Sequence, residues 1–150
     1  MKLHSYEYRD PGAVIAEVAE RVPLTEDSAY LVLVADPSTE QRIVTVQRFD
    51  EPALLDDWDD ARREIHRRVS NLPIPREEEP QHSMLTVLVR AGLCVFGPQE
   101  SPWFNAWKYS NHLRRVFGSE FILVTEHGWR HFMTDCAGRQ PALVTPPVHV

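Results

Sequence analysis

The fold is decided by the stretch Tyr30-Leu31-Val32-Leu33-Val34-Ala35 together with the segment that follows it, Arg42-Ile43-Val44-Thr45-Val46-Gln47-Arg48-Phe49. The first segment is almost wholly apolar, which is typical of a central strand covered on both faces. The second is rich in β-branched residues, which favour strands. Only the turn-forming linker Asp36-Pro37-Ser38-Thr39-Glu40 separates them, so the two strands are expected to pair antiparallel.

Three helices are expected around these strands. The first runs over residues 11–22, with Asp10 as its cap and Pro23 as its stop. The second runs over residues 54–71, because apolar residues recur every three or four positions. The third runs over residues 101–117 and is ended by Gly118. The apolar stripe of the second helix consists of Leu54, Trp58, Ala61, Ile65, Val69 and Leu72.

Two further strand pairs are expected, each joined by a two-residue turn that ends in glycine. Residues 84–90 and 93–96 flank Ala91-Gly92, and residues 121–126 and 129–133 flank His127-Gly128. Such turns require a positive φ, so we expect Gly92 and Gly128 to adopt it.

The resulting order is helix, two strands, helix, two strands, helix, two strands. It predicts an α/β (α+β) sandwich in which a mixed, mostly antiparallel sheet packs against about three helices. We expect a single domain over residues 1–133, with an exposed loop at 73–80. The Ala-, Pro- and Gly-rich residues 134–150 are expected to form an extended tail, as an arm or a frayed end.

Composition narrows the functional classes. The net charge of −6 argues against a general nucleic-acid-binding surface, and no apolar run is long enough to cross a bilayer. Four arginines cluster on the second helix after four aspartates, which is typical of a solvated helix face. The chain start lacks the apolar core of a secretory signal, and Cys94 and Cys136 need not pair, so a cytoplasmic protein is expected. The arginines are Arg62, Arg63, Arg67 and Arg68.

From Tyr30 to Phe132 the chain resembles a JAB/MPN domain of the RadC type and, more distantly, the cytidine deaminase fold. The resemblance lies in the order of elements: a leading helix, the hairpin of residues 30–49, a long amphipathic helix, a strand, a helix and a closing strand pair. It implies a JAB-like α/β fold.

The zinc motif of active JAB domains is missing. Those domains bind zinc with a His-x-His-Pro turn followed by Ser and Asp, and they use a glutamate as base. The corresponding stretch, Arg90 to Ser101, contains no histidine, and Phe104 and Asn105 do not supply the aspartate. Since a catalytic zinc site needs three protein ligands, the resemblance implies a degenerate, non-catalytic member without a cofactor.

One segment is a candidate interaction surface, because polar and aromatic side chains are dense on the third helix. Exposed Trp and Tyr residues are typical anchors of protein interfaces. The alternative is that the two tryptophans pack the helix onto the sheet. The candidate binding residues are Trp103, Trp107, Tyr109, Asn111 and His112.

A second hypothesis is a small metal-dependent hydrolase. Its metal ligands would be His112, Glu126, His127 and His131, which are residue types that bind transition metals. Their spacing favours an ordinary hairpin surface instead, because a turn residue and a mid-strand residue need not converge. The chain also has no Gly-x-Ser-x-Gly nucleophile elbow and no phosphate-binding glycine loop.

The leading functional hypothesis is therefore a non-catalytic accessory or protein-interaction domain that binds a protein partner or a second copy of itself. Open sheet edges must be covered, blunted or paired. We expect self-association to use residues 103–117 and the tail after Thr134. The alternative is a monomer whose tail folds back over its own edge.

Overall fold

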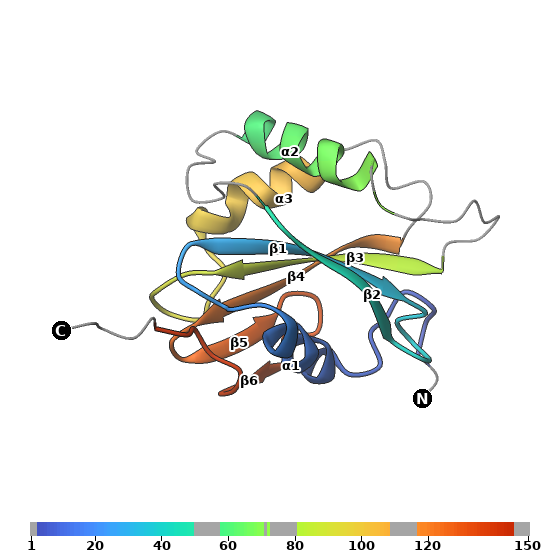
Figure 1. Ribbon diagram of the computed structural model, residues 1–150, viewed down its shortest axis with the longest axis horizontal. Coiled ribbons are helices and arrows are strands. Elements are labelled where there is room, and N and C mark those ends of the chain that lie inside the picture. Colours follow the sequence, from blue (N-terminus) through green and yellow to red (C-terminus); the bar gives the residue numbers. More distant parts are fainter. Residues whose placement is uncertain (1–2, 50–57, 71, 73–80, 109–116, 146–150) are drawn as a thin grey trace.

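The computed structural model describes residues 3–49, 58–70, 72, 81–108 and 117–145. Within them, a single sheet lies between helices on its two faces (Figure 1). The elements are α1 (Pro11–Arg21), β1 (Ser28–Ala35), β2 (Arg42–Arg48), α2 (Trp58–Ser70), β3 (His82–Val89), the 3₁₀ turn η2 (Pro98–Glu100), α3 (Ser101–Lys108), β4 (Phe117–Thr125), β5 (Gly128–His131) and β6 (Ala137–Gly138).

The six strands are ordered β2-β1-β3-β4-β5-β6. In the described part of the chain β3 and β4 are the one parallel pair, and the other four neighbouring pairs are antiparallel. The expected mixed, mostly antiparallel sheet with three α-helices is therefore confirmed.

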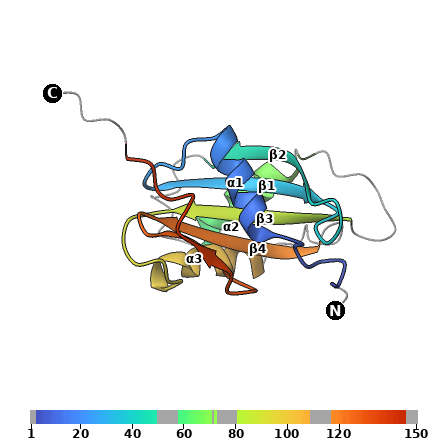
Figure 2. The ribbon, with the colours of Figure 1, turned by 90° about the horizontal axis from the view of Figure 1, so that it is seen from below.

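Two helices, α2 and α3, cover one face of the sheet, and α1 crosses the other (Figures 1 and 2). Every residue of β1 is buried, as expected for a central strand with both faces covered. Leu31 and Leu33 belong to the core under α2 and α3, whereas Val32 and Val34 belong to the core under α1. The alternation of side chains along a strand divides the apolar run between these two cores.

The first helix has the expected cap. The Asp10 carboxylate accepts a hydrogen bond of 3.2 Å from the Ala13 backbone N–H, and Pro11 occupies the first helical turn. The helix ends at Arg21, one residue before the expected end, because Val22 is already extended.

The second helix also has the expected orientation, with Ala61, Ile65 and Val69 buried against the sheet. Arg63 and Arg67 are exposed, with 68% and 55% of their side chains accessible. Leu54 and the side chain of Trp58 lie outside the described residues.

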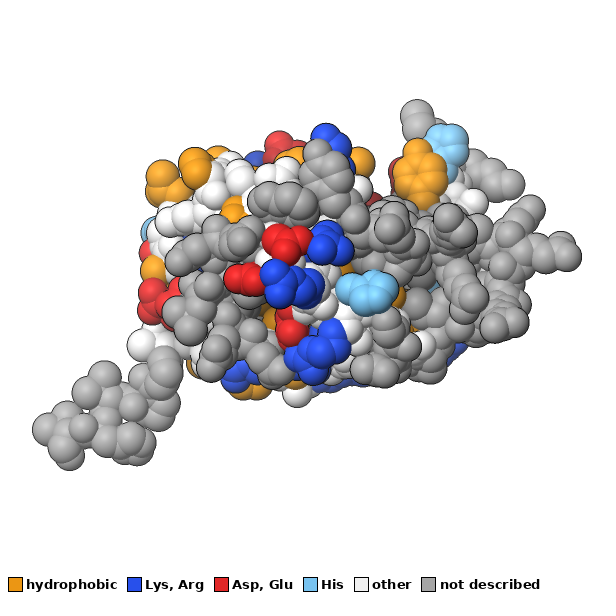
Figure 3. All heavy atoms as spheres, turned by 90° about the horizontal axis from the view of Figure 1, so that it is seen from above, with side chains coloured by type: hydrophobic (Ala, Val, Ile, Leu, Met, Phe, Trp, Pro, Cys, Tyr) orange, Lys and Arg blue, Asp and Glu red, His pale blue; other side chains and the backbone are white. Residues whose placement is uncertain are grey.

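The outer surface of α2 carries acidic and basic side chains side by side (Figure 3). Arg62 and Arg63 both bind Asp59, whose pKa is lowered by these two guanidinium groups. Arg67 and Arg68 both bind Glu64. The arginine cluster is thus matched by acids of its own helix, as a solvated face requires.

Truncating the buried stripe of α2 tests this packing. The Ile65 side chain is fully buried in the core under α2 and α3, so Ile65→Ala is expected to lower the free energy of unfolding by roughly 2 to 5 kcal/mol. Urea unfolding measures the change, with the exposed Arg63→Ala as control. A loss below about half a kcal/mol would show that α2 is peripheral to the core.

The hairpin expected at Ala91-Gly92 is wrong. Gly92 does adopt a positive φ of 112°, but residues 93–96 form a loop. Both edges of β3 are already hydrogen-bonded, one to β1 and one to β4, so no edge remains for a returning strand. For the same reason Cys94, expected in a buried strand, lies in this loop and is half-buried.

The end expected for the third helix is also wrong, because Phe117 and Gly118 belong to β4. Phe117 is the parallel partner of Ser83, and Gly118 lies at the register shift before Ser119, the partner of Met84. The described part of α3 ends at Lys108.

The closing hairpin is confirmed, with its turn one residue earlier than expected. Thr125 pairs with Gly128, so Glu126 and His127 form the turn and Gly128 begins β5 with a φ of 121°.

The start of the tail adds a strand that the sequence pattern did not indicate. Ala137 and Gly138 form β6 and pair with β5. Farther on, the Leu143 N–H donates to the Thr125 carbonyl and the Val144 N–H donates to the Leu24 carbonyl. No described helix is long and apolar enough to span a bilayer.

Candidate functional site

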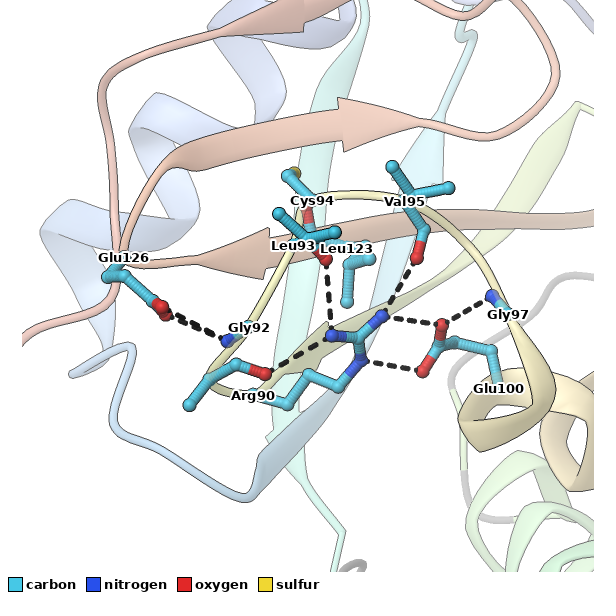
Figure 4. A network of polar contacts seen from close by, with 10 residues as sticks. Arg90, Gly92, Leu93, Cys94, Val95, Gly97, Glu100, Leu123 and Glu126 are labelled. Carbon is cyan, nitrogen blue, oxygen red and sulfur yellow. Dashed lines mark hydrogen bonds and ion pairs between the residues drawn. The ribbon is translucent and has the colours of Figure 1, made fainter.

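A buried ion pair joins the end of β3 to the start of the helical segment η2–α3 (Figure 4). Arg90 donates to the two carboxylate oxygens of Glu100 at 2.8 and 3.0 Å. Glu100 is almost wholly buried and also accepts a hydrogen bond of 2.9 Å from the Gly97 N–H. The hydrogen bond to Glu100 raises the pKa of Arg90 above its usual value, so the guanidinium stays charged.

The same guanidinium fixes the loop of residues 91–97. It donates to the carbonyl oxygens of Ala91, Leu93 and Val95. Those of Leu93 and Val95 point toward it in Figure 4. From the other side, the Gly92 N–H donates to the Glu126 carboxylate. Hydrogen bonds from its own N–H and from Gly92 lower the pKa of Glu126. A loop without secondary structure is thereby held in one conformation.

Three phenylalanine rings meet beside this loop. Phe96 lies 5.0 Å from Phe132 and 5.8 Å from Phe104 between ring centroids, and Phe104 lies 4.9 Å from Phe132. Phe104 also packs edge-on against the buried ring of Phe121, which anchors the group to the core. We call Phe96, Phe104 and Phe132, with their exposed chain neighbours Leu93, Val95 and Met133, the phenylalanine patch.

Much of this patch is accessible to solvent. Exposed fractions are 74% for Leu93, 57% for Val95, 46% for Phe132 and 63% for Met133. These are four of the seven large apolar residues that are exposed in the described part of the chain. They lie on the loop of residues 91–97 and directly after β5, the two segments that also supply Phe96 and Phe132 to the ring cluster.

The two tryptophans of the expected interaction surface do not lie on any surface. Trp103 packs against Phe49, with ring centroids 4.9 Å apart, and Trp107 donates a hydrogen bond of 2.8 Å to the Thr86 hydroxyl. Both are buried in the core and pack α3 onto the sheet, as the alternative interpretation of these tryptophans expected. Tyr109, Asn111 and His112 lie outside the described residues.

The residues of the alternative metal site do not converge in the described chain. Glu126 and His127 are exposed in the turn, whereas His131 is buried at the far end of β5. His131 faces Glu120 at 2.8 Å and Thr134 at 2.7 Å, and it uses both ring nitrogens there. Among residues 3–49, 58–70, 72, 81–108 and 117–145, no group of three His, Cys, Asp or Glu side chains is placed to hold a metal ion. His112 lies outside these residues.

His131 is instead part of a buried polar cluster beneath the N-terminal segment. The Tyr8 ring packs edge-on against His131, and the Tyr8 hydroxyl lies 2.9 Å from the Ser83 hydroxyl. Burial raises the pKa of Tyr8 far above its usual value, so the phenol stays protonated. The cluster joins the chain start, β3, β4 and β5, and it satisfies buried polar groups.

Two pockets flank the loop of residues 91–97. The larger, of about 560 Å³, lies between the start of β1, the end of β3 and η2, and its charged lining is Glu26, Asp27, Glu100 and Arg90. The smaller, of about 320 Å³, lies between the loop, β5 and β6. Cys94 borders the smaller pocket, and burial raises the pKa of its thiol, so it is not an activated nucleophile.

Sequence reasoning missed the phenylalanine patch because its rings come from separate elements. Phe96 belongs to a loop, Phe104 to α3, and Phe132 follows β5. Each reads as a core residue in its own segment. The sequence signal for this patch is the apolar run of residues 93–96, but the pattern of that run predicts a strand and not an exposed loop. Comparison with known protein families, curated proteins and solved structures finds no match for this chain.

Proposed function

We propose that this protein is a cytosolic accessory domain without metal-dependent catalysis, which binds a second copy of itself through the phenylalanine patch. The observations that carry the proposal are the mutual ring contacts of Phe96, Phe104 and Phe132 and the exposure of Phe132. Leu93, Val95 and Met133, in the same two chain segments as Phe96 and Phe132, are exposed as well. Contiguous exposed apolar surface of this kind marks interaction sites, and Phe and Met are enriched at interfaces.

The patch is ordered before any partner arrives. Arg90 holds the carbonyl groups of Leu93 and Val95, and Phe104 rests on the buried Phe121. Binding therefore costs little loop-ordering entropy, which is the main advantage of a preorganised interface. Met133 adds a side chain that adapts to the shape of the opposing surface.

A second copy of the chain is a suitable partner for the phenylalanine patch because the patch carries no charge. A two-fold interface brings the same surface together from both subunits, so a patch with charge of one sign would repel itself. The six residues of the phenylalanine patch are uncharged. The net charge of −6 disfavours a nucleic-acid partner.

The scaffold that we propose is a JAB-like fold that lacks the metal motif. The order α1-β1-β2-α2-β3-α3-β4-β5 agrees with the element order on which the resemblance rests. In the stretch that corresponds to the zinc motif, the chain has an Arg90–Glu100 ion pair and no histidine. The free thiols of Cys94 and Cys136 suit a reducing cytosol.

Light scattering tests the proposal. The intact protein should have about twice its chain mass of 17.3 kDa at micromolar concentration and should dissociate on dilution. Phe132→Asp and Met133→Asp should each give the single-chain mass, because a carboxylate would be buried in the interface. Met133→Asp should keep a melting temperature close to that of the unmodified protein, since this side chain is 63% exposed. Phe132→Asp also loses the ring contacts with Phe96 and Phe104, so Met133→Asp is the variant that isolates the interface.

Tyr6→Asp is the matched control, since Tyr6 has nearly the same exposure as Phe132 but lies in the N-terminal segment. It should leave the dimer intact. A mass of 17.3 kDa for the intact protein at every concentration would overturn the proposal.

A further inference from the structure

The lining of the smaller pocket is positively charged, whereas the whole chain has a negative net charge. Its lining includes Cys94, His127, Trp129, Arg130, Arg139 and both residues of β6. Two arginines supply its permanent charge, and no carboxylate belongs to the lining. The chain as a whole carries −6, and the larger pocket has three carboxylates against one arginine. A concave site with charge of one sign concentrates ions of the other.

The first arginine, Arg130, is bound through two of its three guanidinium nitrogens. Arg130 donates from Nε to the Cys94 carbonyl oxygen at 3.0 Å and from Nη1 to the Asp135 carboxylate at the rim. Within the described chain its Nη2 has no hydrogen-bond partner. Asp135 offsets part of the charge, but it fixes the guanidinium plane and leaves an edge of the fork open to a ligand.

The second arginine, Arg139, makes no side-chain hydrogen bond or ion pair within the described part of the chain. It follows β6 directly. Arginine donates two parallel N–H groups that match the geometry of carboxylate and phosphate oxygens. His127, exposed in the turn beside the pocket, adds a further polar group.

Trp129 and β6, which belong to the pocket lining, are fixed in position. The Trp129 indole N–H donates to the Gln140 carbonyl at 3.0 Å, and a Cβ on Gly138 would lie only 2.6 Å from that indole nitrogen. β6 therefore lies directly on the indole ring. The thiol of Cys94 remains neutral and does not cancel the positive charge.

We propose that this pocket binds a small oxyanion, namely the carboxylate or phosphate group of a small molecule, between Arg130 and Arg139. A volume of about 320 Å³ accommodates such a group together with a short organic part. The proposal is independent of the phenylalanine patch and of self-association, because it needs only the loop, β5 and β6 of one chain.

NMR titration with sodium phosphate and, separately, with sodium acetate tests the site. Ionic strength is kept constant with sodium chloride, so that screening does not change during the titration. The backbone amide signals of Gly138 and Arg139 should shift and reach saturation with at least one of the two anions. The anion that saturates at lower concentration identifies the ligand class.

Arg139→Gln should weaken binding about tenfold or more, as expected for loss of a charge-assisted hydrogen bond. It should leave the melting temperature unchanged, since Arg139 has no described partner. Arg42→Gln, an exposed arginine on β2, is the matched control and should bind as the unmodified protein does. Shifts that never saturate, or that are the same in Arg139→Gln, would overturn the proposal.

Discussion

Arg90→Met is expected to lower the free energy of unfolding by about 3 kcal/mol or more, because it leaves the buried Glu100 carboxylate without its counter-ion. The change also removes the donors to the carbonyl groups of Ala91, Leu93 and Val95. Urea unfolding followed by tryptophan fluorescence measures the loss. Hydrogen exchange in the loop of residues 91–97 should rise at the same time.

Two further variants separate the buried pair from ordinary surface charge. Arg90→Met combined with Glu100→Gln should recover a large part of the loss, since no unpaired carboxylate then remains and the glutamine oxygen can still accept from Gly97. Arg21→Met removes an exposed partner of Glu17 and should cost less than about half a kcal/mol. An equally small loss for Arg90→Met would mean that the pair does not hold the loop.

Gly128→Ala is expected to be comparably severe, at about 3 kcal/mol, for steric reasons. Gly128 has a φ of 121°, a conformation that strains any residue with a Cβ. Its Cβ would also lie 2.0 Å from the Gly138 carbonyl oxygen and 2.8 Å from the Arg139 Cα. These are backbone atoms, so β6 must move away from β5 to relieve the contact.

A series of glycine variants distinguishes strain from collision. Gly97→Ala meets no atom within 4 Å and should be nearly neutral. Gly92→Ala has the strain of a φ of 112°, but its Cβ meets only Arg90 Nη1, at 3.2 Å, which is a much milder contact than that at Gly128, so its loss should be intermediate. In thermal unfolding, the decrease in melting temperature should therefore be smallest for Gly97→Ala, intermediate for Gly92→Ala and largest for Gly128→Ala. Equal losses for Gly92→Ala and Gly128→Ala would show that the contact with β6 is unimportant.

Both of these residues act on the region that carries the proposed functions. Arg90 orders the loop that presents Leu93 and Val95, and Gly128 allows β6 to close one wall of the anion pocket. Gly128→Ala should accordingly weaken phosphate or acetate binding while Phe132→Asp leaves it intact. The two proposals therefore respond to different substitutions.

The elements that could be predicted are those whose local pattern and tertiary environment agree. In α1, the Asp10 cap, the first-turn Pro11 and the stripe through Val14 and Val18 all indicate one helix, and the structure contains it. In β1, the unbroken apolar run could only belong to a strand buried on both faces, because no helix fits so short a segment between turns. Consistent local signals leave few alternatives.

The elements that could not be predicted depend on the pairing partners. Residues 93–96 have the composition of a strand, but β1 and β4 already occupy the edges of β3. Gly118 is a residue type that often ends a helix, but it lies inside β4, at the register shift between the pairs Ser83–Phe117 and Met84–Ser119. Ala137 and Gly138 have no strand pattern, yet a small residue is required where β6 lies against Trp129.

The candidate site shows the same division. The sequence by itself determined the fold class, the central strand, the acidic net charge and the absence of the zinc motif, because each depends on residue type or on spacing within one segment. Only the tertiary structure decided that Trp103 and Trp107 are buried while Phe132 and Met133 are exposed, and that Arg90 pairs with Glu100. Whether a side chain is buried or exposed depends on elements that are distant in sequence. A loop without periodicity, such as residues 91–97, is positioned by tertiary hydrogen bonds, here those of the Arg90 side chain.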